Sequence, residues 1–211
     1  MLAELLNPAK ALIFRIVHKD NIARVLEDGC HCRSAQAATA PYAEIGNQEL
    51  IEKRRHRDVP CGPGGTLSDY VPFYFTPFTP MLYNIKTGYG VPQQPLTNIV
   101  MLVSSLPRLR ASEVPFVFSD RHAYLKLAQF SDDLADLDRI IWPVLQARDF
   151  TRDDLDKFEK YQAEALIYKH VPVDALIGIA CYNSAMRDAV RQIAEEKNVV
   201  VDVIAKNSWY L

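Results

Sequence analysis

The sequence contains no apolar run that approaches the roughly 20 residues of a membrane-spanning helix. Its start, residues 1–8, also lacks the basic segment and the apolar core of a secretory signal peptide. The four cysteines have neither paired spacing nor a secretory context, which argues against a disulfide framework. These absences predict a soluble, cytoplasmic protein that does not act at a membrane.

Paired metal-binding cysteines are also missing. Cys30-His31-Cys32 together with Cys61 is a weak candidate for a metal site, because a Cys-x-Cys pair without a second pair falls short of the usual structural zinc pattern. Reduced thiols explain these residues better. We therefore predict no metal cofactor.

An excess of positive charge is missing as well. The 24 lysines and arginines stand against 26 aspartates and glutamates, which gives a net charge of -2. Attraction of nucleic acid by the protein as a whole is therefore excluded, and such binding must come from a local patch. The candidate patch is the basic run 53–57, for which a solvated helix face is the alternative interpretation.

What is present is ordinary globular composition over 211 residues, with 49% hydrophobic and 24% charged residues. This length fits a single domain, 1–211, with a sizeable core. Strand-like runs occur at 11–17, 70–75, 98–104, 115–119, 163–168, 175–181 and 199–204. The stretch 120–158 instead predicts helical pieces, starting with 121–130, in an insertion over one side of the sheet that serves substrate selection.

The stretch 69–83 combines a strand with a helix start. Residues 70–75 are aromatic and β-branched, and Pro72 among them indicates a strand end, an edge or a bulge. Thr79 and Pro80 predict an N-cap and a first helical residue. A strand that turns directly into a helix can form the floor of a site, although a buried corner explains the same residues.

Two further helices are predicted from their caps. Asp20 is expected to cap a helix that Gly29 ends, and Asn47 a helix with Leu50 and Ile51 inside and the basic residues of 53–57 mostly outside. His18 precedes the first of these helices. It can bind a polar ligand there or satisfy nearby backbone groups.

Glu164 is a carboxylate that is costly to bury, because it opens the apolar strand 163–168. A glutamate in this position either pairs with an arginine or has a chemical task. Perturbed carboxylates are enriched at active sites, but structural ion-pair networks imitate them. Both interpretations stay open from this residue alone.

A series of short motifs follows in order over nearly the whole chain: His18-x-x-Asn21, Gly29, Ile51-x-x-Arg54-Arg55, Gly64-Gly65-Thr-Leu-x-Asp-Tyr-Val-Pro-Phe-Tyr-Phe, Pro80-Met-Leu-Tyr83, Gln162-Ala163-Glu164 and Trp209-Tyr210. Each motif is weak by itself, but their combination and spacing are specific. Together they resemble the DarT family. Its members are bacterial toxins that transfer ADP-ribose from NAD to a base in single-stranded DNA, thymidine in one branch and guanosine in another.

The resemblance implies an ADP-ribosyltransferase fold of the α+β class, in which a split, mixed β-sheet grips NAD. A largely helical, substrate-facing loop region would span about 106–161. Glu164 would be the catalytic glutamate, and Arg54 or Arg55 the arginine of the NAD-binding helix. The implied contacts of the dinucleotide are His18, Asn21 and Gly29.

The implied chemistry suits these residue types. When nicotinamide leaves, a carboxylate such as Glu164 that holds the ribose 2′-hydroxyl stabilises the oxocarbenium-like cation. The attacking base nitrogen, such as thymine N3, must lose a proton, but a guanidinium stays protonated and is a poor base. We therefore assign Arg55 to stabilising the deprotonated base and Arg54 to an NAD phosphate, an assignment that the doublet leaves open.

One position departs from the family pattern. Phe78 stands where the family commonly has the arginine of Pro-Arg-Ser-Pro-Met-Leu. The exchange removes a positive contact and offers a ring that can stack on a base. Tyr83 is a second candidate for stacking, with core packing as its other interpretation.

The resemblance also implies partners, which are single-stranded DNA and a macrodomain antitoxin, DarG. We expect a monomeric toxin of the thymidine branch. The first alternative keeps the fold but has protein, RNA or water as the acceptor. The second, a non-catalytic nucleic-acid-binding module using 53–57, is disfavoured by Glu164, because a carboxylate repels phosphate.

Overall fold

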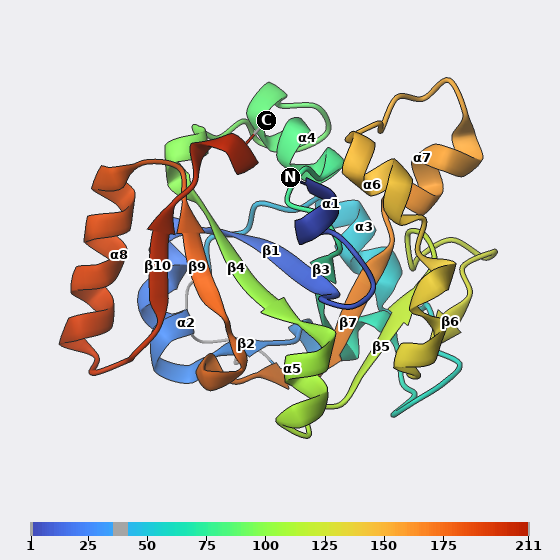
Figure 1. Cartoon of the computed structure of the whole chain (residues 1–211), viewed down its shortest axis with the longest axis horizontal. Coiled ribbons are helices and arrows are strands. Elements are labelled where there is room, and N and C mark those ends of the chain that lie inside the picture. The colour runs from blue at the N-terminus through green and yellow to red at the C-terminus, as the bar shows by residue number, and fades with distance from the viewer. Residues whose placement is uncertain (1, 36–41, 211) are drawn as a thin grey trace.

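The computed structural model describes residues 2–35 and 42–210, which fold as a mixed β-sheet flanked by helices (Figure 1). The strands are β1 (Leu12–His18), β2 (Cys30–His31), β3 (Tyr70–Tyr74), β4 (Ile99–Ser105), β5 (Phe116–Ser119), β6 (Phe130–Ser131), β7 (Glu164–Tyr168), β8 (His170–Val171), β9 (Gly178–Cys181) and β10 (Asp202–Ala205). The α-helices are α1 (Leu2–Leu5), α2 (Ile22–Asp28), α3 (Gln48–Arg54), α4 (Pro80–Thr87), α5 (Leu106–Ala111), α6 (Trp142–Ala147), α7 (Leu155–Tyr161) and α8 (Ser184–Glu196). The predicted α+β class is confirmed, and each predicted strand run overlaps a strand. No helix in the described ranges is long and apolar enough to cross a membrane.

The main sheet has the strand order β10-β9-β4-β1-β3-β7-β5-β6, and β2 and β8 form a separate pair. Strands β9 and β10 are parallel, whereas the other neighbours are antiparallel. The sheet is therefore mixed, as expected. Figure 1 shows α8 beside β10 at one end of the sheet and α6 and α7 toward the other end.

The centre of the sheet is split between β1 and β3. Strand β1 pairs with β4 through seven residues, and β3 pairs with β7 through five. Within these described strands, β1 and β3 meet at the single pair Phe14 and Tyr74. The two halves of the sheet diverge from this point, which opens the space that holds the candidate site.

Pro72 marks the open side of β3. Its carbonyl accepts a 2.8 Å hydrogen bond from Arg15 Nη1 on β1 rather than from a backbone N–H. In an antiparallel ladder the N–H and C=O of one residue point to the same neighbour, so the N–H that proline lacks would face the split. Pro72 therefore leaves the ladder with β7 intact, as predicted for a proline at a strand edge.

The core lies on both faces of the sheet. Strand β4 is buried along its whole length, and α8 turns Val190 and Ala194 inward. Phe75 packs edge-on against Phe118 and Trp142, with ring centroids 6.3 and 5.6 Å apart. Each large apolar side chain buried in this way contributes about 1.5–3 kcal/mol, which holds the divergent strands in place.

The predicted caps have mixed outcomes. Asn47 Oδ1 accepts from the Leu50 N–H at 2.9 Å, and Thr79 Oγ1 from the Leu82 N–H at 3.1 Å, so both caps are confirmed. The prediction for Asp20 is wrong, because Asp20 lies inside a 3₁₀ turn, Lys19–Asn21, that His18 caps. Gly29 ends α2 with a φ of 69°, as predicted.

The range 121–130 is not helical, contrary to prediction. Side chains from elsewhere hold its backbone donors: Glu164 accepts from the Ala123 N–H, and Asp120 from the Gln129 N–H. The range 106–161 is also more than a peripheral loop. It includes β5, which pairs with β7 inside the main sheet.

Candidate functional site

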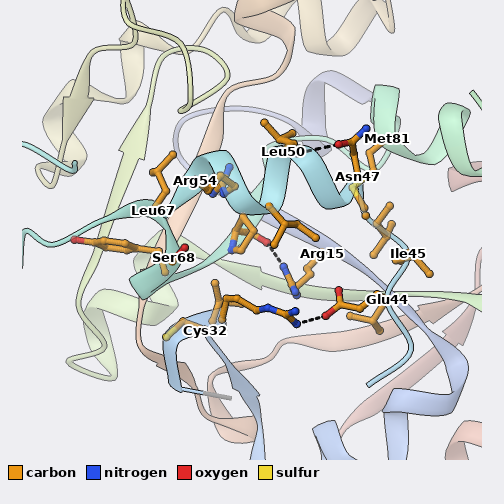
Figure 2. Close-up of a pocket in the computed structure, with 18 of the residues that line it drawn as sticks. Arg15, Cys32, Glu44, Ile45, Asn47, Leu50, Arg54, Leu67, Ser68 and Met81 are labelled. Carbon is orange, nitrogen blue, oxygen red and sulfur yellow. Dashed lines mark hydrogen bonds and ion pairs between the residues drawn. The ribbon is translucent and has the colours of Figure 1, made fainter. Parts of the chain in front are cut away.

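A cavity lies in the split of the sheet (Figure 2). It opens to solvent, and the empty space within it, open solvent included, is about 1060 Å³. Its walls come from β1, residues 42–47, α3 and β3. Four of the six predicted site residues line it, namely His18, Asn21, Arg54 and Glu164.

Glu164 lies at the start of β7, opposite Tyr74 of β3 and Ser119 of β5, and is 1% exposed. Arg54 Nη1 donates to Glu164 Oε2 at 3.0 Å and to Oε1 at 3.3 Å. The Ala123 N–H donates to Oε1 at 3.1 Å. The backbone of Glu164 is thus held by strand pairing, and its carboxylate is held by Arg54 and the Ala123 N–H.

The surroundings keep Glu164 ionised. Burial by itself raises the pKa of this carboxyl, but Arg54, His122 and the Ala123 N–H act against burial, and the net shift lowers the pKa. His122 Nδ1 lies 3.3 Å from Glu164 Oε1. Burial lowers the pKa of His122 even though Glu164 favours the charged form, so this imidazole is neutral at pH 7.

Arg54 is an exception within the basic run 53–57, which was predicted to lie mostly outside; it lines the cavity, the position expected of a residue that contacts NAD. Its side chain is 12% exposed, because Leu50, Ile51 and Arg54 share the helix face that lines the cavity. Arg55 lies one residue further around the helix. Its side chain is 49% exposed and pairs with Glu52 at 2.9 Å, and it does not line the cavity.

Three buried polar atoms in the described part of the chain have no hydrogen-bond partner: Arg15 Nε, Arg54 Nη2 and Ser68 Oγ. All three residues line this cavity (Figure 2). A buried donor without a partner costs about 1–3 kcal/mol, so such atoms are rare unless ordered water, an ion or a ligand satisfies them. Their concentration here indicates a polar ligand.

Asn21 and Gly29 act on the shape of the site. Asn21 exchanges two hydrogen bonds with the backbone of Ala43, at 3.0 and 2.9 Å, and so holds the 42–47 wall. Gly29 does not line the cavity. A Cβ there would lie 2.3 Å from the Val171 carbonyl oxygen, so close strand packing together with the positive φ explains this glycine.

Sequence reasoning missed several cavity residues. His122 follows β5 within the range that was predicted to be helical, where a strand-end position was not considered. Arg15 interrupts the apolar run of β1, and a charge in a buried strand was a signal that could have identified it. Tyr74 also lines the cavity, and burial raises the pKa of its phenol, which keeps it protonated.

Phe78 does not offer its ring to a ligand, contrary to prediction. It is fully buried, and the Arg148 guanidinium lies 3.6 Å from its ring centroid. Tyr83, in contrast, is 48% exposed. It borders a second, outer hollow, which we call the aromatic hollow and which is lined by Pro80, Tyr83, Asn84, Tyr89, Arg148, Phe150, Thr151, Arg152 and Phe158.

Known proteins resemble the chain over nearly its full length. The DNA ADP-ribosyl transferase of Escherichia coli O127:H6 is 50% identical over 208 residues, 97% of this chain and 95% of the relative. DarT of Thermus sp. 2.9 in complex with ADP-ribosylated ssDNA superimposes with a TM-score of 0.89 at 33% identity, covering 97% and 98% of the two chains. The same protein in complex with NAD+ gives a TM-score of 0.84 at 32% identity over 96% and 98%.

A more distant structure, Thermosipho africanus DarTG in complex with ADP-ribose, shares the fold at 16% identity with a TM-score of 0.75. This chain covers 50% of that protein, which covers 94% of this chain. The family model DarT, described as ssDNA thymidine ADP-ribosyltransferase, matches residues 14–211. From this match and the identity to the Escherichia coli enzyme, the chain belongs to the DarT family.

Proposed function

We propose that the protein is a toxin that transfers ADP-ribose from NAD+ to a base in single-stranded DNA, thymidine in the first instance. The observation that carries the proposal is the buried, ionised Glu164 beside Arg54 in the split of the sheet. Family membership supports NAD+ as the donor and DNA as the acceptor.

In the proposed reaction, the bond between ribose C1′ and the nicotinamide nitrogen breaks, and nicotinamide leaves with the bonding electron pair. A new bond forms between C1′ and the base nitrogen, which loses its proton. Glu164 accepts a hydrogen bond from the ribose 2′-hydroxyl and stabilises the cation as it develops. Because Glu164 is already ionised before the substrate binds, its carboxylate does not have to lose a proton during the reaction.

We assign the arginine role to Arg54 in place of Arg55. Arg54 binds Glu164 through Nη1, and its buried Nη2 has no partner among the described residues. This second nitrogen can donate to the base oxygen next to the reacting nitrogen, or to NAD+. The fixed fork of the guanidinium lets one side chain orient the carboxylate and the substrate together.

His122 is the group in the cavity best suited to take the proton from the base. Its imidazole is neutral at pH 7, whereas the guanidinium of Arg54 stays protonated. Glu164, 3.3 Å from Nδ1, favours the imidazolium that proton uptake produces. We therefore propose His122 as the general base. Its Nδ1, which accepts a 3.2 Å hydrogen bond from the Tyr124 N–H, is the nitrogen that would take the proton, beside Glu164.

The flanking nucleotides are proposed to bind in the aromatic hollow. Helix α4 separates the two sites, because Met81 lines the cavity and Tyr83 lines the hollow. Arg152 lies over the rings of Tyr89 and Phe158, at 5.6 and 4.9 Å. Aromatic rings with arginines suit single-stranded DNA, whose bases stack and whose phosphates need cations.

The deciding experiment incubates the protein with labelled NAD+ and oligonucleotides that contain a single type of reactive base. Transfer of label to a thymidine oligonucleotide, with release of nicotinamide, is expected. Label on protein or RNA would point to another acceptor, and release of nicotinamide without labelled product would point to a glycohydrolase. Label on guanosine oligonucleotides would place the enzyme in the other branch.

The strand state of the DNA is part of the proposal. Thymine N3 lies inside a duplex, and extruding a paired base costs a few kcal/mol, which a protein of net charge -2 has little electrostatic surplus to offset. We also propose that the toxin works as a monomer in the cytoplasm, where NAD+ and DNA occur. Its proposed partner is a DarG-type macrodomain antitoxin that removes the ADP-ribose.

A further inference from the structure

A cluster of two histidines and one aspartate lies on the two-stranded sheet formed by β2 and β8. His31 of β2 is directly opposite His170 of β8, and the two rings stack with centroids 4.3 Å apart. Asp28, the last residue of α2, completes the cluster. Three separate elements thus bring one side chain each to the same point.

The ligand atoms of these residues converge. His31 Nε2 lies 2.8 Å from Asp28 Oδ2, and His170 Nε2 lies 2.7 Å from the Asp28 carbonyl oxygen. One donor atom from each of the three side chains lies within 4.8 Å of the other two. A tetrahedral ion with bonds of about 2.0 Å needs donors roughly 3.3 Å apart. On binding, both imidazoles would exchange their Nε2 contacts with the Asp28 carbonyl oxygen for bonds to the ion.

Gly29 makes this convergence possible. A Cβ at this position would lie 2.6 Å from His170 Nε2, and the residue adopts a φ of 69°. A larger residue would push the imidazole away from the end of α2. The glycine that the sequence motif singled out therefore has its contacts at this cluster and not in the catalytic cavity.

We propose that Asp28, His31 and His170 form a binding site for a divalent transition-metal ion, with Zn²⁺ as the best match. Two imidazole nitrogens and one carboxylate oxygen suit zinc and its neighbours in the periodic table, whereas Mg²⁺ and Ca²⁺ prefer oxygen ligands. A water molecule would complete the tetrahedron. The side chain of Asp28 is 62% exposed and that of His31 27% exposed, which leaves an entry path for the ion.

The bound ion would brace the catalytic site without taking part in the reaction. It would tie the end of α2 to β2 and β8. Strand β8 follows β7, which carries Glu164, after the single residue Lys169. His31 of β2 itself lines the cavity, together with Cys32 and Arg33. The ion would therefore fix the distance between two walls of the cavity.

The test uses the full chain without a polyhistidine tag, stripped with a chelator, and measures Zn²⁺ by equilibrium dialysis and Co²⁺ by its absorption spectrum. One equivalent of Zn²⁺ and a tetrahedral Co²⁺ spectrum are expected. At free Zn²⁺ of about 100 times the dissociation constant, the melting temperature should rise by about 5–10 °C. His31→Asn and His170→Asn should each weaken binding by about 100-fold or more and abolish the temperature rise.

Two further variants make the test specific. His56→Asn removes an exposed histidine outside the cluster and should leave both readouts unchanged. Asp28→Asn removes a largely exposed carboxylate, so it should fold even where a histidine variant does not, and it should weaken Zn²⁺ binding. Absence of Zn²⁺ binding by the wild type, or equal affinity in the cluster variants, would overturn the proposal. The two histidines would then only hydrogen-bond to Asp28 at the end of α2.

Discussion

The cavity in the split sheet and the aromatic hollow across α4 differ in how they hold charge. In the cavity, Glu164 and Arg54 are buried together, and polar atoms are left without partners. In the hollow, Arg148 and Arg152 are exposed and lie over rings. A buried, fixed charge can act on a transition state, whereas exposed charges and rings can bind a flexible polymer. The difference separates the proposed chemistry from the proposed DNA binding.

Removing the carboxylate charge should have the largest effect and should leave the hollow intact. Glu164→Gln preserves shape and hydrogen bonding but loses the negative charge, and we expect kcat to fall by at least the roughly 10²–10³-fold that follows loss of one preorganised stabiliser. NAD+ binding should stay within a few-fold. Initial rates with labelled NAD+ measure the first quantity, and calorimetric titration measures the second.

The fold of the Glu164→Gln variant needs a separate check by circular dichroism and thermal melting. If the variant does not fold, Glu164 acts as a structural partner of Arg54. A folded variant with wild-type turnover would contradict the catalytic assignment outright.

The arginine doublet provides a matched pair for the second prediction. Arg54→Ala leaves Glu164 buried without its cation and removes a donor aimed at the substrate, so it should lower kcat/KM by about 100-fold or more, the usual effect of losing one preorganised donor. Arg55→Ala removes an exposed i,i+3 pair worth at most about 1 kcal/mol and should change kcat/KM less than two-fold. Equal losses in the two variants would mean that Arg55 reaches the substrate after all.

This arginine doublet also shows which features of the structure could be predicted from the sequence and which could not. The strands, the caps at Asn47 and Thr79, and the pairing of Glu164 with an arginine were predictable, because they depend on local pattern and on a costly burial. Which of two adjacent arginines faces inward was not predictable. It depends on where α3 meets the split, and the split itself depends on long-range pairing between β1, β3 and β7.

His122 and Phe78 show the same limit. His122 becomes part of the site through a turn whose backbone N–H groups bind Glu164 and Asp120, and this arrangement has no helical or strand period. Phe78 looked available for stacking because the family has a charged residue there. The structure instead covers its ring with Arg148, so the positive charge comes from a distant segment.

The third prediction concerns the acid side of the pH profile. His122 must be neutral to accept a proton, and burial places its pKa below the ordinary 6.5. Activity should therefore be constant from pH 8 to about 6.5 and fall at lower pH, as His122 becomes protonated. Glu164 stays ionised through this range, because its pKa lies below the ordinary 4.5.

The His122→Asn variant identifies the group that titrates. It should lower kcat by about 10²–10⁴-fold, the usual contribution of a general base, and should lose the fall in activity below pH 6.5. The measurement is kcat against pH for both proteins, with circular dichroism at each pH. An unchanged acid limb in His122→Asn would assign the titration to another group.

The smallest expected effects lie in the aromatic hollow, and they should appear in DNA binding and not in turnover. Tyr83→Ala or Tyr89→Ala removes an exposed ring and should raise the KM for DNA by about five-fold or more, since stacking one base is worth about 1–3 kcal/mol. Arg152→Gln should reduce the slope of log affinity against log salt by about 0.7, the value for one phosphate contact on single-stranded DNA.

Arg187→Gln on α8, at the other end of the sheet (Figure 1), is the matched charge control and should leave the slope unchanged. Anisotropy of a labelled oligonucleotide over a salt series measures binding, and initial rates at saturating DNA measure kcat, which should stay within two-fold of wild type in all four variants. If the hollow variants lower kcat and leave DNA affinity unchanged, the hollow belongs to the catalytic apparatus, and the division between the two regions does not hold.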